Sequence, residues 1–151
     1  MRHWLIKSEP EVYSIKDMKR DKSTLWEGVR NYQARNNMQK EMNLGDLAFF
    51  YHSNAEPPGV AGIVEVCSEA LPDPLAFDKK SEYFDPKSKV DSPTWYAVKF
   101  KFKEEFKTLV SLSTIKGRKE LANMVLLKNG RLSVQPVGQK EFDLICKLGR
   151  E

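Results

Sequence analysis

Hydrophobic and polar residues alternate most regularly from Trp95 to Phe106, in the segment WYAVKFKFKEEF. A period of two places neighbouring side chains on opposite faces of a strand. One face then carries residues 96, 98, 100 and 102, which are apolar, and the other carries lysines at 99, 101 and 103. This pattern predicts a strand with one face buried and the other in water.

Four apolar runs predict further strands, at residues 3–8, 47–53, 60–71 and 131–137. The run LAFFYHS at 47–53 is apolar almost throughout, which favours burial on both faces. Gly62 interrupts the third run and predicts a bend or a bulge. We expect Pro136 to end the last strand, because proline has no N–H to donate to a neighbouring strand.

Helix signals separate these runs. Ser14 and Asp17 have capping-box spacing and predict a short helix to about residue 20. Asn31 is a suitable N-cap for a helix over 31–42, with Ala34, Met38 and a methionine at 42 as its buried stripe. Three more helices are expected, at residues 111–117, 119–130 and 139–149.

The predicted order is β-α-α-β-β-β-α-α-β-α, with no repeat and no linker, so we expect one domain over residues 1–151. The fold class is α/β in the broad α+β sense. An antiparallel-rich curved sheet or small barrel with flanking helices fits this order best. Residues 72–93 form a long segment rich in Pro, Asp, Lys and Ser, and loops of this length tend to be functional or mobile.

Composition excludes several classes of protein. With 40% hydrophobic and 30% charged residues, no run is long enough for a membrane span. The start MRHWLIKSEPEVYS is unlike a signal peptide, so we expect an intracellular protein, cytoplasmic or, in a eukaryote, nuclear. Cys67 and Cys146 are then expected to be reduced. These cysteines and two histidines lack metal-ligand spacing, so we expect no metal and no cofactor.

The net charge of +4 is unevenly distributed. Residues 14–40 contain seven basic and three acidic residues, and the rest of the chain has 18 of each. The whole excess therefore lies in this segment. A local basic surface favours a polyanion such as nucleic acid, although a solvated helix face explains the charge equally well.

The stretch WEGVRNYQARN, at 26–36, has neither helical nor strand periodicity, but it has groups that bind nucleic acid. Aromatic rings stack on bases, cations hold phosphates, and amides bond to base edges. Each residue also has a purely structural explanation, as part of the core or as an exposed cation. The candidates are aromatic residues Trp26, Tyr32, Tyr51 and Trp95, cations Lys7, Arg30 and Arg35, and amides Asn31, Asn36 and Gln135.

Catalytic motifs are missing. The chain has no P-loop, no G-x-G-x-x-G and no G-x-S-x-G. His52 and Ser53 are the only candidate base and nucleophile, and neighbours on a strand point to opposite faces. Two alternatives to a binding module for nucleic acid stay open: an enzyme acting on a nucleic acid or nucleotide, and a module that binds peptides.

Six ordered motifs, WLIKSEP, WEGVRNYQARN, GDLAFFYHSN, PGVAGIVEV, SPTWYAVKF and RLSVQPV, resemble the EVE domain family. The resemblance covers His3 to about Leu148, and residues 81–92 carry little of it. It implies a PUA-like pseudo-barrel, related to the YTH domains. It also implies a non-catalytic reader of DNA or RNA that accepts a flipped modified base, 5-methylcytosine or 5-hydroxymethylcytosine, in an aromatic pocket. We expect the protein to be a monomer.

Matching the family motifs residue by residue implies a base-binding site. Lys7 and Ser8 would lie at the pocket mouth, Trp26 would form one wall, and Trp95 is a candidate second wall. His52 or Ser53 could bond to a hydroxymethyl group. The remaining residues implied by the motifs are Arg30, Asn31, Tyr32, Arg35, Asn36, Tyr51, Gln135 and Pro136.

Overall fold

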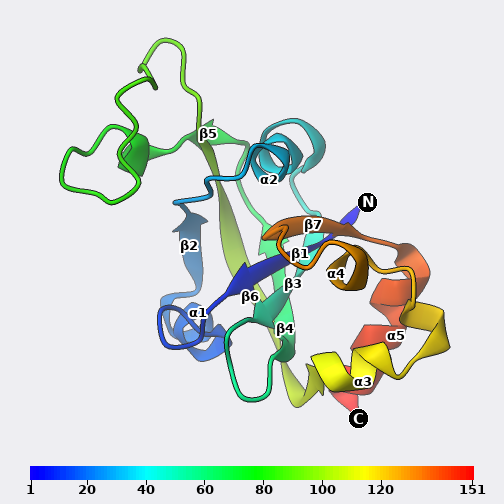
Figure 1. Cartoon of the computed structure of the whole chain (residues 1–151). Coiled ribbons are helices and arrows are strands. Elements are labelled where there is room, and N and C mark those ends of the chain that lie inside the picture. The colour runs from blue at the N-terminus through cyan, green and yellow to red at the C-terminus, as the bar shows by residue number, and fades with distance from the viewer.

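A computed structural model describes all residues, 1–151, and its centre is a curved mixed sheet (Figure 1). The strand order is β2-β6-β4-β3-β1-β7, and β5 pairs with β6 beside this path. The sheet does not close, because β2 and β7 form its two edges. The strands are β1 His3–Ser8, β2 Ser23–Trp26, β3 Leu47–His52, β4 Gly59–Val66, β5 Leu71–Pro72, β6 Tyr96–Ser111 and β7 Val134–Val137.

Strand β6 organises the sheet, since its 16 residues pair with β2, β4 and β5. Only β1 and β3 run parallel, and every other pair is antiparallel. The register between β4 and β6 shifts at Gly62, which confirms the predicted bulge. A Cβ atom at Gly62 would collide with the carbonyl oxygen of Glu104, so only glycine allows this close approach.

The helical elements are α1 Ile15–Asp21, α2 Tyr32–Asn36, α3 Leu112–Lys116, α4 Val125–Lys128 and α5 Gln139–Arg150. A π-helical turn at Asn37–Glu41 continues α2, and short 3₁₀ turns lie at Pro74–Ala76 and Lys119–Leu121. The capping box at Ser14 and the Asn31 N-cap are both confirmed. No helix has the length and apolar character needed to cross a bilayer.

Strand β3 is buried on both faces, as its apolar run predicts, whereas β6 has the exposed lysines at 99, 101 and 103 that its alternation predicts. Alternate residues of β3 belong to different cores, with Phe50 in one and Phe49 in the other. The first core lies under α1 and α2, where Met18 and Ala34 are fully buried. The second lies under α3, α4 and α5. Figure 1 shows these two groups of helices on either side of the sheet, with residues 73–95 extending beyond it.

Several predicted boundaries are wrong. Strand β2 was not expected at all, and the run at 60–71 leaves the strand at Val66. The helix expected at 119–130 is a 3₁₀ turn followed by α4. Pro136 does not end β7 but lies within it, which is possible because β7 is an edge strand.

Candidate nucleic-acid interface

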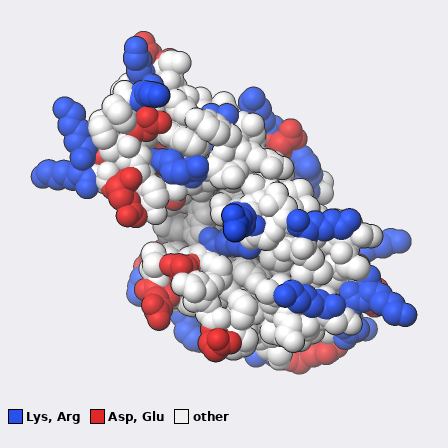
Figure 2. All heavy atoms as spheres, viewed as in Figure 1, with Lys and Arg blue, Asp and Glu red and all other residues white.

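A pocket of about 560 Å³ opens between β2, the first residues after β1 and the 73–95 segment. Figure 2 shows the corresponding hollow in this face of the molecule. Pockets of 300–1,000 Å³ are typical sites for small ligands, and a single base fits within this range. The lining residues are Lys7, Ser8, Val12, Tyr13, Thr24, Leu25, Trp26, Glu27, Gly28, Val29, Arg30, Asn31, Leu75, Tyr83 and Ser133.

Three aromatic side chains, Tyr13, Trp26 and Tyr83, line this pocket. Trp26 is half-buried, and its ring packs edge-on against Phe50 and Phe100 at centroid distances of 5.6 and 6.0 Å. The core therefore fixes the orientation of the indole, while part of the ring stays accessible from the pocket. A fixed, accessible ring is the surface on which a flat ligand stacks.

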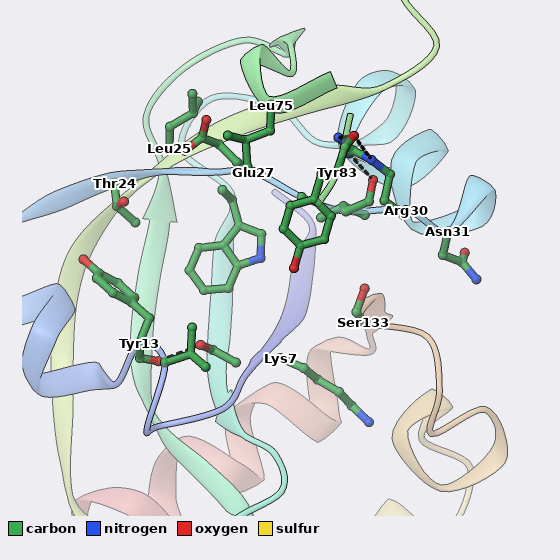
Figure 3. A pocket seen from close by; sticks show the side chains of 15 residues that line it. Lys7, Tyr13, Thr24, Leu25, Glu27, Arg30, Asn31, Leu75, Tyr83 and Ser133 are labelled. Atoms are coloured by element: carbon green, nitrogen blue, oxygen red, sulfur yellow. Dashed lines mark hydrogen bonds between the residues drawn. The ribbon is translucent and has the colours of Figure 1, made fainter. Parts of the chain in front are cut away.

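Tyr83 comes from the long loop and is held against the residues that follow β2. Arg30 donates two hydrogen bonds to the Tyr83 carbonyl oxygen, at 2.8 and 3.2 Å. The Tyr83 ring lies so close to Gly28 that a Cβ there would be 2.9 Å from a ring carbon. Gly28 also has φ +78°, a conformation that favours glycine. Figure 3 shows the Tyr83 ring directed into the pocket, with Lys7 and Ser133 on the opposite side.

Asp73 connects the loop to the pocket wall. Its side chain is fully buried and accepts hydrogen bonds from the Gly28 N–H at 2.8 Å and the Leu75 N–H at 2.8 Å. Arg30 donates to the same carboxylate at 2.9 Å. Since Arg30 also binds Tyr83, one ion pair fixes both the backbone at Gly28 and the aromatic ring above it.

Polar groups surround the aromatic rings. The Lys7 ammonium donates to the Gly130 carbonyl oxygen, and burial lowers the pKa of Lys7. Ser8 donates to the Tyr13 carbonyl oxygen at 2.6 Å. Asn31 is occupied as a helix cap through its Oδ1, which accepts from the Ala34 N–H at 3.0 Å. Burial raises the pKa of Glu27, helped by the negative charge of Asp73 nearby.

Five of the residues expected at the site line this pocket: Lys7, Ser8, Trp26, Arg30 and Asn31. Tyr32, Arg35, Asn36 and Trp95 form a neighbouring group that does not line it. In that group the Tyr32 and Trp95 rings stack at 5.0 Å, and the Arg35 guanidinium lies 5.0 Å from the Tyr32 ring. Trp95 is 6% exposed and donates its Nε1–H to Asp85 at 2.8 Å. Tyr83 lines this pocket and Trp95 does not.

The residues expected from β3 and β7 lie elsewhere. Tyr51 is buried in the core under α3–α5, and the Ser53 N–H donates to the Ser8 carbonyl oxygen at 2.9 Å. His52 accepts from the Ile15 N–H through Nε2 at 3.1 Å, and burial lowers its pKa. Gln135 is fully buried and donates to the Leu132 carbonyl oxygen, while Pro136 pairs with β1. None of these five residues lines the pocket.

The sequence interpretation missed Tyr13, Thr24, Asp73 and Tyr83. Tyr13 precedes the Ser14 helix cap, and Thr24 lies within β2, a strand that the sequence did not predict. Tyr83 and Asp73 belong to the long loop, and its length was the only signal that pointed to them. No group of three or more His, Cys, Asp or Glu side chains is arranged to hold a metal ion.

Comparisons with known proteins agree with this architecture. The sequence pattern of the "EVE domain" family matches residues 2–148. Human thymocyte nuclear protein 1 is 42% identical over 165 residues, covering 97% of this chain and 73% of that protein.

Two solved structures have a TM-score of 0.94. One is a hypothetical protein from Leishmania major, 46% identical, covering 99% of this chain and 94% of that one. The other is human THYN1 protein in complex with 5-methylcytosine-containing DNA, 42% identical, covering 100% of this chain and 99% of that one. The chain therefore belongs to the EVE domain family.

Proposed function

We propose that the chain is a single, non-catalytic EVE domain that reads a modified cytosine in a nucleic acid. The flipped base enters the pocket and stacks between Trp26 and Tyr83. The observation that carries this proposal is the placement of two aromatic rings, one fixed by the core and one by the Arg30–Asp73 ion pair, in one open pocket. The human relative bound to 5-methylcytosine-containing DNA supports the same ligand class.

Physical magnitudes set what this pocket can achieve. Stacking a base on aromatic side chains contributes ~1–3 kcal/mol, which offsets the few kcal/mol needed to extrude it. Extrusion costs least from a single strand. One buried methyl group contributes about 0.8 kcal/mol, equal to about fourfold in affinity. We therefore expect a modest preference for 5-methylcytosine over cytosine.

The contacts of His52 disfavour the enzyme alternative. A general base must lie within hydrogen-bond reach of the group that it deprotonates. His52 uses Nε2 to accept from the Ile15 N–H, and it does not line the pocket. Because His52 does not line the pocket, it is also not placed to donate to a hydroxymethyl group there. The lining residues with hydroxyl groups are Ser8, Tyr13, Thr24, Tyr83 and Ser133.

The experiment titrates the protein with matched single-stranded DNA and RNA containing one cytosine, 5-methylcytosine or 5-hydroxymethylcytosine, followed by tryptophan fluorescence. The test variant is Tyr83→Leu, because Tyr83 is 37% exposed and its loss creates no buried cavity. Tyr32→Leu is the control, since Tyr32 is an exposed tyrosine that stacks on Trp95 outside the pocket.

We expect wild type to prefer a modified oligonucleotide about fourfold. Tyr83→Leu should weaken binding about tenfold, within the range for a lost stacking contact. Tyr32→Leu should leave affinity within about twofold. Equal affinity of wild type for all oligonucleotides would refute base reading. If Tyr32→Leu lost more affinity than Tyr83→Leu, the base would bind at the neighbouring group that contains Tyr32 and Trp95, and not in this pocket.

A further inference from the structure

The basic residues near the pocket differ in whether an acidic partner neutralises them. Lys16 and Lys19 pair with Glu105, and Arg20 pairs with Asp17 and Asp21. Acidic partners therefore neutralise several of the basic side chains in the 14–40 segment. Phosphate contacts need cations that are not already committed to protein carboxylates.

Residues 112–133 have such cations. This segment, from α3 to the start of β7, contains five basic residues and a single acidic one, Glu120. None of the five makes an ion pair or a side-chain hydrogen bond, whereas the protein has nine ion pairs elsewhere. The five are Lys116, Arg118, Lys119, Lys128 and Arg131, and all are exposed.

The loop at residues 128–131, Lys-Asn-Gly-Arg, brings part of this charge to the pocket mouth. Lys7, which lines the pocket, donates to the carbonyl oxygen of Gly130 in this loop. Ser133, just beyond it, also lines the pocket. Buried leucines at 126 and 132 anchor the loop at both ends. The charges of Lys128 and Arg131 are thus held beside the opening, and Lys7 retains donors for a second partner.

The opposite side of the mouth has the opposite sign. Val12 lines the pocket there, and its neighbours Glu9 and Glu11 are exposed. Figure 2 shows Lys and Arg side chains along the edge of the hollow nearest α4 and β7, and Asp and Glu side chains across from them. A polyanion is attracted to the first edge and repelled from the second.

We propose that Lys7, Lys128 and Arg131 form a phosphate-binding surface for the nucleic-acid strand that flanks the flipped base, continued by Lys119 and Arg118. The strand then enters over the 128–131 loop and not over the acidic edge. This inference rests on the proposed function, since it assumes a nucleic-acid ligand. The surface gives affinity without sequence information, while the pocket gives preference for the base.

The test compares Lys128→Gln/Arg131→Gln with Lys140→Gln/Lys147→Gln, which removes equal charge. The control residues are exposed, unpaired lysines of α5, a helix that contributes no residue to the pocket lining. Affinity for a single-stranded 5-methylcytosine oligonucleotide is measured across a salt series. Each phosphate contact to a single strand contributes about 0.7 to the slope of log K against log salt.

We expect the test variant to lose about 1.4 of this slope and the control almost none. Wild type then loses about sevenfold more affinity than the test variant between roughly 50 and 200 mM salt. The ratio between modified and unmodified oligonucleotides should stay unchanged in both variants. Unfolding midpoints equal to that of wild type show that both variants are folded.

An unchanged slope in the test variant, or an equal loss in the control, would overturn the proposed surface. A wild type that binds modified and unmodified oligonucleotides equally would instead refute the base-reading function, whatever the slopes. The two failures are therefore distinguishable in one data set.

Discussion

Replacing Asp73 by alanine tests whether a buried ion pair builds the pocket. Removing one partner of a buried pair costs ~3–5 kcal/mol, because the other partner is left without compensation. The Arg30 side chain is 21% exposed and keeps the carbonyl oxygens of Tyr83 and Val29 as acceptors. We therefore expect a cost at the lower end of this energy range. The Gly28 N–H loses its acceptor as well. We expect the free energy of unfolding to fall by about 3 kcal/mol.

Chemical denaturation measures that loss directly, and thermal unfolding should show a midpoint lowered by about 6–12 °C. Oligonucleotide affinity should fall together with stability, because Asp73 fixes the backbone under the Tyr83 ring. Glu41→Ala is the control, since its ion pair with Arg2 is half-exposed and contributes at most about 1 kcal/mol. An Asp73→Ala loss no larger than that of Glu41→Ala would refute the reasoning.

Three further predictions concern single side chains. Burial lowers the pKa of His52, so below about pH 6.5 the unfolded chain binds the proton more readily than the folded chain, and the free energy of unfolding decreases as the pH is lowered. Denaturation at several pH values should show a weaker pH dependence for His52→Gln than for wild type. Burial raises the pKa of the Cys146 thiol to about 11, so a thiol reagent should modify Cys67 first and Cys146 only after unfolding, as mass spectrometry would show. Gly149→Ala should destabilise the protein by ~1–3 kcal/mol in denaturation, because its Cβ would collide with the buried Phe106 ring.

Local signals were sufficient for the elements that local chemistry determines. The Ser14 capping box and the Asn31 cap lie where the sequence places them, because each needs only a side chain and a backbone N–H three residues later. Strand β2 has no such signal. Its residues, STLW, are all half-buried, and their strand conformation comes from pairing with β6, about 75 residues later in the chain.

The site shows the same limit. Trp26 was identified from its motif, and in the structure its ring packs on the core and lines the pocket. Trp95 was chosen as its counterpart by analogy, yet its indole N–H is bound to Asp85 and its ring is covered by Tyr32. Tyr83 lines the pocket instead, because Arg30 and Asp73 hold a loop that no periodicity describes. Only the folded chain brings those residues together.

The formal charge of a sequence segment did not show where the unpaired cations lie in the folded protein. The segment 14–40 has the whole formal excess, but five of its seven cations bind carboxylates or carbonyl oxygens, several of them far away in the sequence. Residues 112–133 look unremarkable by comparison, yet their five cations are unpaired and exposed. A polyanion responds to the potential at the surface, in which paired charges largely cancel. The basic surface of a protein is therefore a tertiary property. In this domain the segment with the formal excess keeps few unpaired cations, whereas the unpaired Lys128 and Arg131 lie beside the pocket mouth.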